Sequence, residues 1–241
     1  MLKLLPEYQS AQIVRTRDQS LIDRADVVVD VGAVYDPSSK RSVYSLISTS
    51  HLHRVSYRFD HHQATFKETM SGLKPGKDWH PIRLSSAGLV FFHFGNRVIS
   101  QLLQVDADQP VIDVLFDRLY EGLIREIDAI DNGVPIAEKA VYEIHTDLSS
   151  RVAHLMPQWG EESSDEILNQ QFHKAMQLVG QEFTDRVLNL WKHWWPVRSL
   201  VKDAILKRHE SVSSACFLLL ETDCFVVFFV SGYMSRVKSW I

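Results

Sequence analysis

The sequence predicts an α/β fold for residues 1–135, and three observations support this prediction. The valine run DVVVDVG at 26–32 is typical of a parallel strand that is buried on both faces. YRFDHH at 57–62 is a second strand candidate, and SSAGLVFFHFGNRVISQLLQ at 85–104 has the pattern of a helix capped by Ser85 or Ser86. Strands that alternate with helices indicate a layered α/β architecture.

The other elements follow from local patterns. AQIVRT at 11–16 alternates apolar and polar residues and predicts a short strand. Apolar residues recur every three or four positions across 111–131, which predicts a helix that ends at Asn132-Gly133. A second long helix is predicted from a capping box at Ser163 to a stop before Pro196.

The C-terminal part, residues 136–241, is predicted to be a helical linker followed by part of a second domain. Its tail, ACFLLLETDCFVVFFV at 215–230, predicts one or two buried strands. A membrane segment is the alternative, but Glu221 and Asp223 divide the tail into halves that are too short to span a bilayer.

Composition excludes a global electrostatic attraction to nucleic acid. The formal net charge is −4, so a polyanion would have to be bound locally or through metal ions. The two cysteines lie near the C-terminus and fit no zinc spacing, which indicates a reducing compartment and no disulfide framework.

Acidic residues and histidines stand where predicted elements end. Asp30 ends the valine run, and Asp60, His61 and His62 end the strand at 57–62. In α/β sheets, sites form at the carboxyl ends of parallel strands. Because strand side chains alternate faces, we expect one histidine to be a ligand and the other to face a substrate, with Asp60 orienting an imidazole from behind.

Asp128 and Asp131 add carboxylates from a third segment. They are three residues apart, so they share one face of the predicted helix. Mixed carboxylate and histidine ligands favour manganese, magnesium, cobalt or iron over a closed structural zinc site. Taken singly, each feature also has a simpler interpretation: a polar turn at the two histidines, a helix cap at Asp30, and a solvated helix end at Asp128 and Asp131.

Several ordered motifs carry a resemblance to a known family. VVVDVG, FDHHQATFKETMS, LSSAGLVFFHFG and EIDAIDNGV resemble the melanocyte-proliferating-gene-1 (Myg) family of the DHH phosphoesterase superfamily, as do LPEYQSAQIVRTRD and LSSRVAHLMPQW. The resemblance covers residues 2–40 and 57–210. It implies a Rossmann-like parallel sheet that binds two divalent metals, often manganese, and a 3′-to-5′ RNA exonuclease of mitochondria and nucleus.

The resemblance also implies a role for each candidate residue. Asp30 would bridge two metals and His61 would ligate one of them. His62 would face the scissile phosphate, and Asp60 would support the histidines. Asp131 is the better match for the last acidic metal ligand, with Asp128 second. RNA or a short nucleotide would be the substrate, and no membrane partner is expected.

Three departures from the family pattern shape the expectations. The family has a strand with a His-x-Asp-type motif before the segment that begins at Met1, so we expect a truncated domain that lacks its first strand. Residues 42–56 interrupt the pattern and are expected to be a poorly packed loop. Beyond residue 211 the resemblance ends.

These departures leave three hypotheses. The first is an RNA phosphodiesterase, the second is a hydrolase of small phosphoanhydrides or nucleotides, and the third is a catalytically impaired product. On ligand count, we expect about one manganese ion to bind and RNA to be hydrolysed at least ~100-fold more slowly than with the upstream segment restored.

Overall fold

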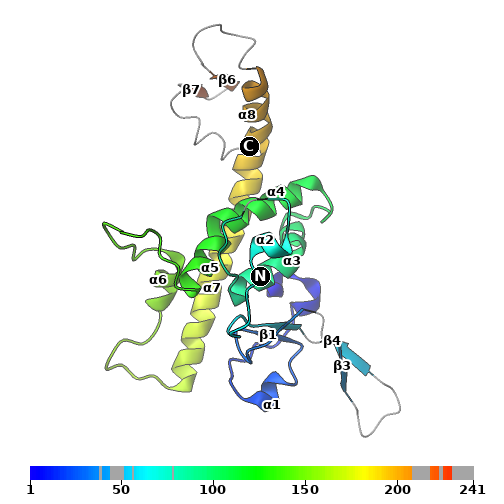
Figure 1. Cartoon of the computed structure of the whole chain (residues 1–241), viewed down its shortest axis with the longest axis vertical. Coiled ribbons are helices and arrows are strands. Elements are labelled where there is room, and N and C mark those ends of the chain that lie inside the picture. Colours follow the sequence, from blue (N-terminus) through cyan, green and yellow to red (C-terminus); the bar gives the residue numbers. More distant parts are fainter. Residues whose placement is uncertain are drawn as a thin grey trace. The chain divides into compact units, whose positions relative to one another are not determined.

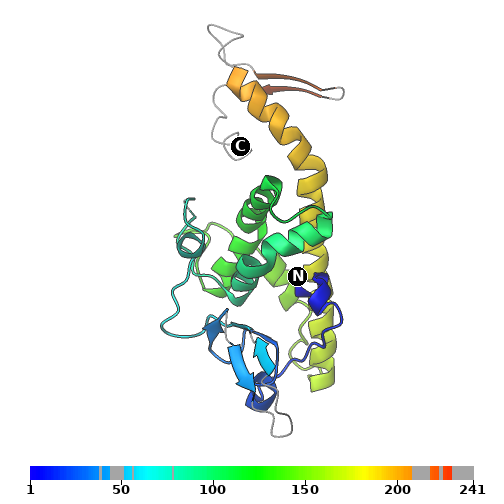
Figure 2. The same cartoon turned by 90° about the vertical axis from the view of Figure 1, so that its right-hand side faces the viewer.

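We describe the chain from a computed structural model, which describes residues 1–37, 40–43, 52–55, 57–77, 79–207, 218–222 and 225–229. Figures 1 and 2 show its helices and strands in two views. The chain forms two compact units, Met1–Thr184 and Asp185–Ile241. The domain boundary at 135/136 that the sequence predicts stays a prediction.

The site-bearing sheet is small and mixed. It contains β1 (Val27–Val29), β5 (Tyr57–Phe59) and β2 (Tyr35–Asp36), in the order β1-β5-β2. β1 and β5 pair in parallel, which confirms a parallel strand at the valine run and a strand in the segment at 57–62, and β2 pairs antiparallel with β5. The α/β class is therefore confirmed.

Burial of the valine run on both faces is wrong. Val28 is buried, but Val29 is 39% exposed. Among the described residues, β1 is an edge strand with a hydrogen-bonded neighbour on one side only, so the end of the run remains accessible to solvent.

Aromatic packing fixes the sheet against α3 (Ser86–Leu103). Phe59 of β5 is fully buried and lies 5.8 Å, ring centre to ring centre, from Phe94 of α3, in an edge-on contact. Tyr57 makes a similar contact with Phe94 at 5.8 Å, and His93 lies 5.2 Å from Phe59. Offset and edge-on aromatic pairs of this kind stabilise a core beyond their buried area. The contact places the end of β5 against one face of α3.

A second face of α3 packs on α4 (Pro110–Leu119). Phe91 stacks on Phe116 with ring centres 4.4 Å apart, and both side chains are buried. Gly95 allows this close approach, because a Cβ at that position would lie 2.8 Å from the Phe116 ring. α3 is therefore held between the sheet and the helices that follow it.

The helix predicted at 111–131 is confirmed, with one change in its winding. α4 leads into a π-helical turn, η3 (Tyr120–Ile124), and then into α5 (Arg125–Asp131). A π-helical turn accommodates one extra residue, which rotates everything after it around the helix axis. The turn therefore sets the directions in which α5 presents Asp128 and Asp131.

The long helix predicted at 163–195 differs from the structure at both ends. α7 runs Asp165–Asn189, and its cap lies one residue later than predicted, because the hydroxyl of Ser164 rather than Ser163 accepts the N–H of Ile167, at 3.4 Å. The predicted stop before Pro196 is wrong, since the π-helical turn η4 (Leu190–Trp194) and α8 (Trp195–Lys207) continue the helix. The π-helical turn interrupts the regular α-helical winding just before Pro196, which has no N–H to donate to the preceding turn.

Two further predictions need correction. Residues 11–16 form no regular secondary structure, although a strand was predicted there. The loop predicted at 42–56 has strands at both ends, since β3 (Lys40–Val43) pairs antiparallel with β4 (Leu52–Val55). Residues 44–51 and 56 lie outside the described residues.

The remaining elements are short. β6 (Leu218–Thr222) and β7 (Phe225–Phe229) pair antiparallel, which confirms strands in the apolar tail. The others are η1 (Leu2–Leu4), η2 (Pro6–Tyr8), α1 (Gln19–Ile22), α2 (Met70–Leu73) and α6 (Leu148–Ala153). Within the described part of the chain, no helix has the length and apolar character needed to cross a bilayer.

Candidate metal centre

Asp30 is held in an unusual backbone conformation at the end of β1. Its φ is 63°, and Gly32 and Ala33 follow with φ of 90° and 50°. Left-handed conformations are uncommon outside glycine, and aspartate tolerates them better than most residues. The Asp30 N–H still donates to the carbonyl of Phe59 at 3.0 Å, so the turn remains tied to the sheet. Strained backbone of this kind is concentrated at functional sites.

Asp60 holds this turn and the neighbouring histidine in place. Its carboxylate is 2% exposed. One oxygen accepts the N–H of Ala33 at 2.7 Å, and the other contacts His62 Nδ1 at 2.6 Å and accepts the His62 N–H at 3.1 Å. Asp60 therefore links the turn after β1 to the segment after β5.

These contacts set the charge states of the pair. Burial raises the pKa of Asp60, but hydrogen bonds from His62 and Ala33 outweigh burial and bring the pKa below its ordinary value. The hydrogen bond to Asp60 in turn raises the pKa of His62, with further contributions from Asp30 and Asp131. An ionised Asp60 thus accepts the proton on His62 Nδ1.

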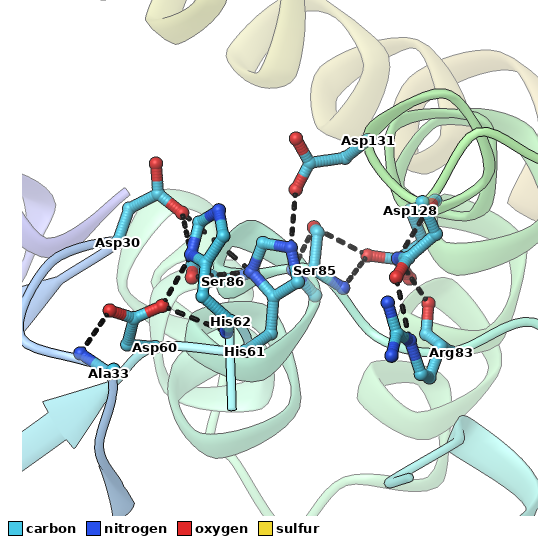
Figure 3. A network of polar contacts seen from close by, with 12 residues as sticks. Asp30, Ala33, Asp60, His61, His62, Arg83, Ser85, Ser86, Asp128 and Asp131 are labelled. Atoms are coloured by element: carbon cyan, nitrogen blue, oxygen red, sulfur yellow. Dashed lines mark hydrogen bonds and ion pairs between the residues drawn. The ribbon is translucent and has the colours of Figure 1, made fainter. Parts of the chain in front are cut away.

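His61 lies between two carboxylates, as Figure 3 shows. Its ring is 4% exposed, with Nδ1 3.7 Å from Asp30 Oδ1 and Nε2 3.2 Å from Asp131 Oδ2. Nδ1 also lies 3.0 Å from the Ser86 hydroxyl and 3.2 Å from the Ser86 N–H. Asp30 is 59% exposed and Asp131 47%, so both carboxylates remain open to solvent.

The two histidine rings do not point to opposite sides as the strand pattern predicted. Their centres are 4.3 Å apart, and both Nδ1 atoms lie within 4 Å of Asp30 Oδ1. β5 ends at Phe59, so the alternation of a regular strand no longer applies at residues 61 and 62.

Four side chains form a group that fits a cation. Asp30, Asp60, His61 and His62 each offer one ligand atom, and these atoms lie within 4.8 Å of one another. Asp131 adds a carboxylate on the other side of His61. Two ligands at right angles on an octahedral ion with bonds of about 2.1 Å are about 3 Å apart. The 3.2 Å between His61 Nε2 and Asp131 Oδ2 matches that separation.

The donor set is chemically suited to a divalent cation. Carboxylate oxygens with imidazole nitrogens are typical ligands for manganese, magnesium and related ions. Several carboxylates facing one point also repel one another, and a cation relieves this repulsion.

Asp128 lies apart from this group. Its side chain is fully buried, and Oδ1 accepts the N–H of Ser85 at 2.9 Å and the Ser85 hydroxyl at 2.7 Å. Burial raises the pKa of Asp128 to about 6, against the opposing effect of the Ser85 hydrogen bonds. The structure thus places Asp131 beside His61 and Asp128 at the start of α3, although both are on α5. The contact of Ser86 with His61 was missed, because the Ser85-Ser86 pair indicated only a helix cap.

A mixed α/β domain that gathers carboxylates and imidazoles at strand and helix ends defines a candidate metal-binding protein. Comparison with known sequences is more specific. The chain belongs to the MYG1 exonuclease family, described as an uncharacterised protein family (UPF0160), whose profile matches residues 1–44 and 49–230. The break at 45–48 lies inside the interruption predicted at 42–56. The match continues to residue 230, so the prediction that the resemblance ends after residue 211 is wrong.

Individual relatives are similar across most of the chain. It is 43% identical to the MYG1 exonuclease of Mus musculus over 217 residues, which are 89% of this chain and 52% of the relative. It is 41% identical to the MYG1 exonuclease of Homo sapiens over 213 residues, 87% of this chain and 51% of the relative. It is 40% identical to the MYG1 protein of Dictyostelium discoideum over 227 residues, 93% of this chain and 61% of the relative.

The chain spans about half the length of the mammalian relatives it matches. No solved structure matches it.

Proposed function

We propose that this chain carries the catalytic site of a metal-dependent phosphodiesterase that hydrolyses RNA from its 3′ end. The observation that carries the proposal is the convergence of Asp30, Asp60, His61 and His62, with Asp131 beside His61. The mammalian relatives are named exonucleases, which supports a nuclease over other metal-dependent hydrolases. Because the chain spans about half of each of these relatives, its activity is itself part of the proposal.

In this proposal Asp30, His61 and Asp131 hold a divalent cation, manganese or magnesium. Asp30 is the residue suited to bridge a second ion, because its carboxylate is half exposed at the end of β1. Bound cations would lower the pKa of a water molecule and neutralise phosphate charge. This local neutralisation is consistent with a chain whose formal net charge is −4.

The chain's own residues would orient the substrate and manage protons. Asp60 holds Nδ1 of His62, so Nε2 is the nitrogen that can contact a phosphate oxygen. His62 is 59% exposed, which makes it accessible to a polymer such as RNA. Its raised pKa favours the imidazolium form, which donates a proton or a charge-assisted hydrogen bond.

We also propose that the sheet is that of the DHH phosphoesterase superfamily, whose domain is Rossmann-like. The parallel pair β1-β5 with the site after its carboxyl ends supports this assignment. A location in mitochondria and nucleus is a prediction from the family resemblance.

The test is a degradation assay on single-stranded RNA labelled at its 5′ end, with manganese or with a chelator. We expect a ladder of products shortened from the 3′ end, dependent on manganese and lost in Asp30→Asn and His61→Ala. His80→Ala is the matched control, since His80 is exposed and lies outside the group. Turnover of pyrophosphate without turnover of RNA would assign the site to small phosphoanhydrides. Turnover of neither substrate would contradict the proposal.

A further inference from the structure

Ser86 makes two different contacts with one ring nitrogen of His61. Its backbone N–H lies 3.2 Å from Nδ1, and its hydroxyl oxygen lies 3.0 Å from the same atom. Both residues are more than nine-tenths buried, with Ser86 3% and His61 4% exposed. A buried ring nitrogen must be satisfied by protein groups, because an unpaired one bears the full cost of its desolvation.

The backbone N–H contact suits only one tautomer of the ring, whereas the hydroxyl contact can suit either. A backbone N–H can only donate, so it satisfies Nδ1 when Nδ1 carries no proton. The ring proton is then on Nε2, where it faces Asp131 Oδ2 at 3.2 Å. A hydroxyl oxygen can accept, so it satisfies Nδ1 when the proton is on Nδ1 and the lone pair on Nε2 is available.

We propose that Ser86 is the positioning residue of His61, and that its hydroxyl accepts the Nδ1 proton when Nε2 is given to a divalent cation. This inference rests on the proposed function, because it assumes that His61 is a ligand. The change of tautomer balances, since Nε2 releases its proton to solvent and Nδ1 takes one from solvent. Histidines that bind metals usually donate their other N–H to an oxygen in this way.

Asp128 and Ser85 hold Ser86 in place for this task. Ser85 caps α3, since its hydroxyl accepts the N–H of Gly88 at 3.2 Å. Asp128 Oδ1 accepts hydrogen bonds from both the N–H and the hydroxyl of Ser85. A Cβ on Gly88 would lie only 2.3 Å from the same oxygen. The buried carboxylate, the cap and the glycine together determine where α3 begins. Asp128 thus acts on His61 through the start of α3.

The test combines ion binding with the protonation pattern of the ring. Isothermal titration with manganese should show Ser86→Ala binding about 10–100-fold more weakly than the unmodified chain, the usual effect of removing such a supporting group. Ser86→Thr, which restores a hydroxyl, should recover most of the affinity. Ser100→Ala is the matched control, because it removes a hydroxyl from the same helix that donates to the carbonyl of Val105 and not to His61, and it should bind manganese as the unmodified chain does.

The second readout is the ¹⁵N spectrum of the His61 ring in the unmodified chain, without metal and with magnesium. We expect the proton on Nε2 without metal and on Nδ1 with magnesium. Equal manganese affinity in Ser86→Ala, or a proton that stays on Nε2 with magnesium, would overturn the role of Ser86 and leave the proposed function standing. Failure of the unmodified chain to bind either ion would instead overturn the proposed function and this role with it. Ion binding without RNA hydrolysis would refute only the nuclease activity.

Discussion

Two regions differ in backbone regularity and polarity: the segments that follow β1 and β5, and the helical region from α3 to α5. The former are irregular, polar and partly open, with left-handed backbone at Asp30 and Ala33. The latter is regular and apolar, and its Phe91 and Phe116 are buried against each other. The comparison teaches that reactive side chains lie where the backbone leaves regular structure, while regular helices determine their positions. The two regions meet at helix ends, namely at Asp131 and Ser86.

Truncation in the helical region should have the largest effect. Phe91→Ala removes a side chain that is fully buried against Phe116 and Phe183. We expect it to lower the free energy of unfolding by about 3–5 kcal/mol. Urea denaturation followed by circular dichroism would measure it, with the partly exposed Phe92 as the matched Phe92→Ala control. Equal losses in the two variants would mean that burial in this region does not determine stability.

Substitutions in the site should weaken manganese binding without lowering the stability of the fold. Asp30→Asn and His61→Ala each remove a proposed ligand, and we expect manganese affinity to fall at least ~100-fold, since loss of supporting groups alone reduces it 10–100-fold. Stability of Asp30→Asn should not fall, because asparagine tolerates the left-handed backbone and the change removes one of several like charges. Titration calorimetry and melting curves on the same samples would test this. If Asp30→Asn unfolded the chain, metal binding and folding would depend on the same residue.

Added volume at a helix crossing should be less harmful than truncation. Gly95→Ala places a Cβ 2.8 Å from the Phe116 ring, and we expect a loss of about 1–3 kcal/mol from overpacking. Gly180→Ala is the matched control, because a Cβ at that position of α7 meets nothing within 4 Å. It should stabilise the chain by up to ~1 kcal/mol, since alanine favours a helix more than glycine. A gain in both variants would show that α3 and α4 can move apart without loss.

The smallest effect should be a pH dependence of the free energy of unfolding, which arises at the contact between the sheet and α3. Burial lowers the pKa of His93 below its ordinary value of 6.5, and its Nε2 lies 2.9 Å from the Tyr35 hydroxyl. Burial raises the pKa of Tyr35 to about 12, so the hydroxyl remains a donor and His93 a neutral acceptor.

Whether stability rises or falls with pH depends on whether the folded or the unfolded chain binds protons more readily at His93. Between the two His93 pKa values the unfolded chain binds more protons, so this contribution to stability is complete above pH 6.5 and is lost as the pH falls towards the folded value. Urea denaturation across this range should give a flatter profile for His93→Gln. An unchanged slope would assign the dependence to another group.

The sequence predicted the elements that local pattern determines. The cap at Ser85, the helix it begins, and the strands at the valine run and in the segment at 57–62 are all confirmed. The proximity of Asp30 to His61 also agrees with the structure, because carboxyl ends of parallel neighbours lie at one edge of a sheet.

What the sequence did not predict depends on contacts between distant segments. Asp128 and Asp131 are equivalent by spacing, and only packing against α3 buries one and exposes the other. Pro196 is an ordinary helix stop in sequence, whereas a π-helical turn comes before it in the structure. The alternating residues at 11–16 satisfied a strand pattern, but a strand also needs a partner, and none pairs with them among the described residues.

The backbone at Asp30 bears on how variants of this chain would be selected. At φ 63° a glycine or an asparagine is less strained than an aspartate, and either replacement removes a negative charge. A library screened only for resistance to heat would therefore enrich replacements at position 30 and discard the residue on which we expect ion binding to depend. Retention of aspartate there through such a screen would be a sign that cation was present during the selection.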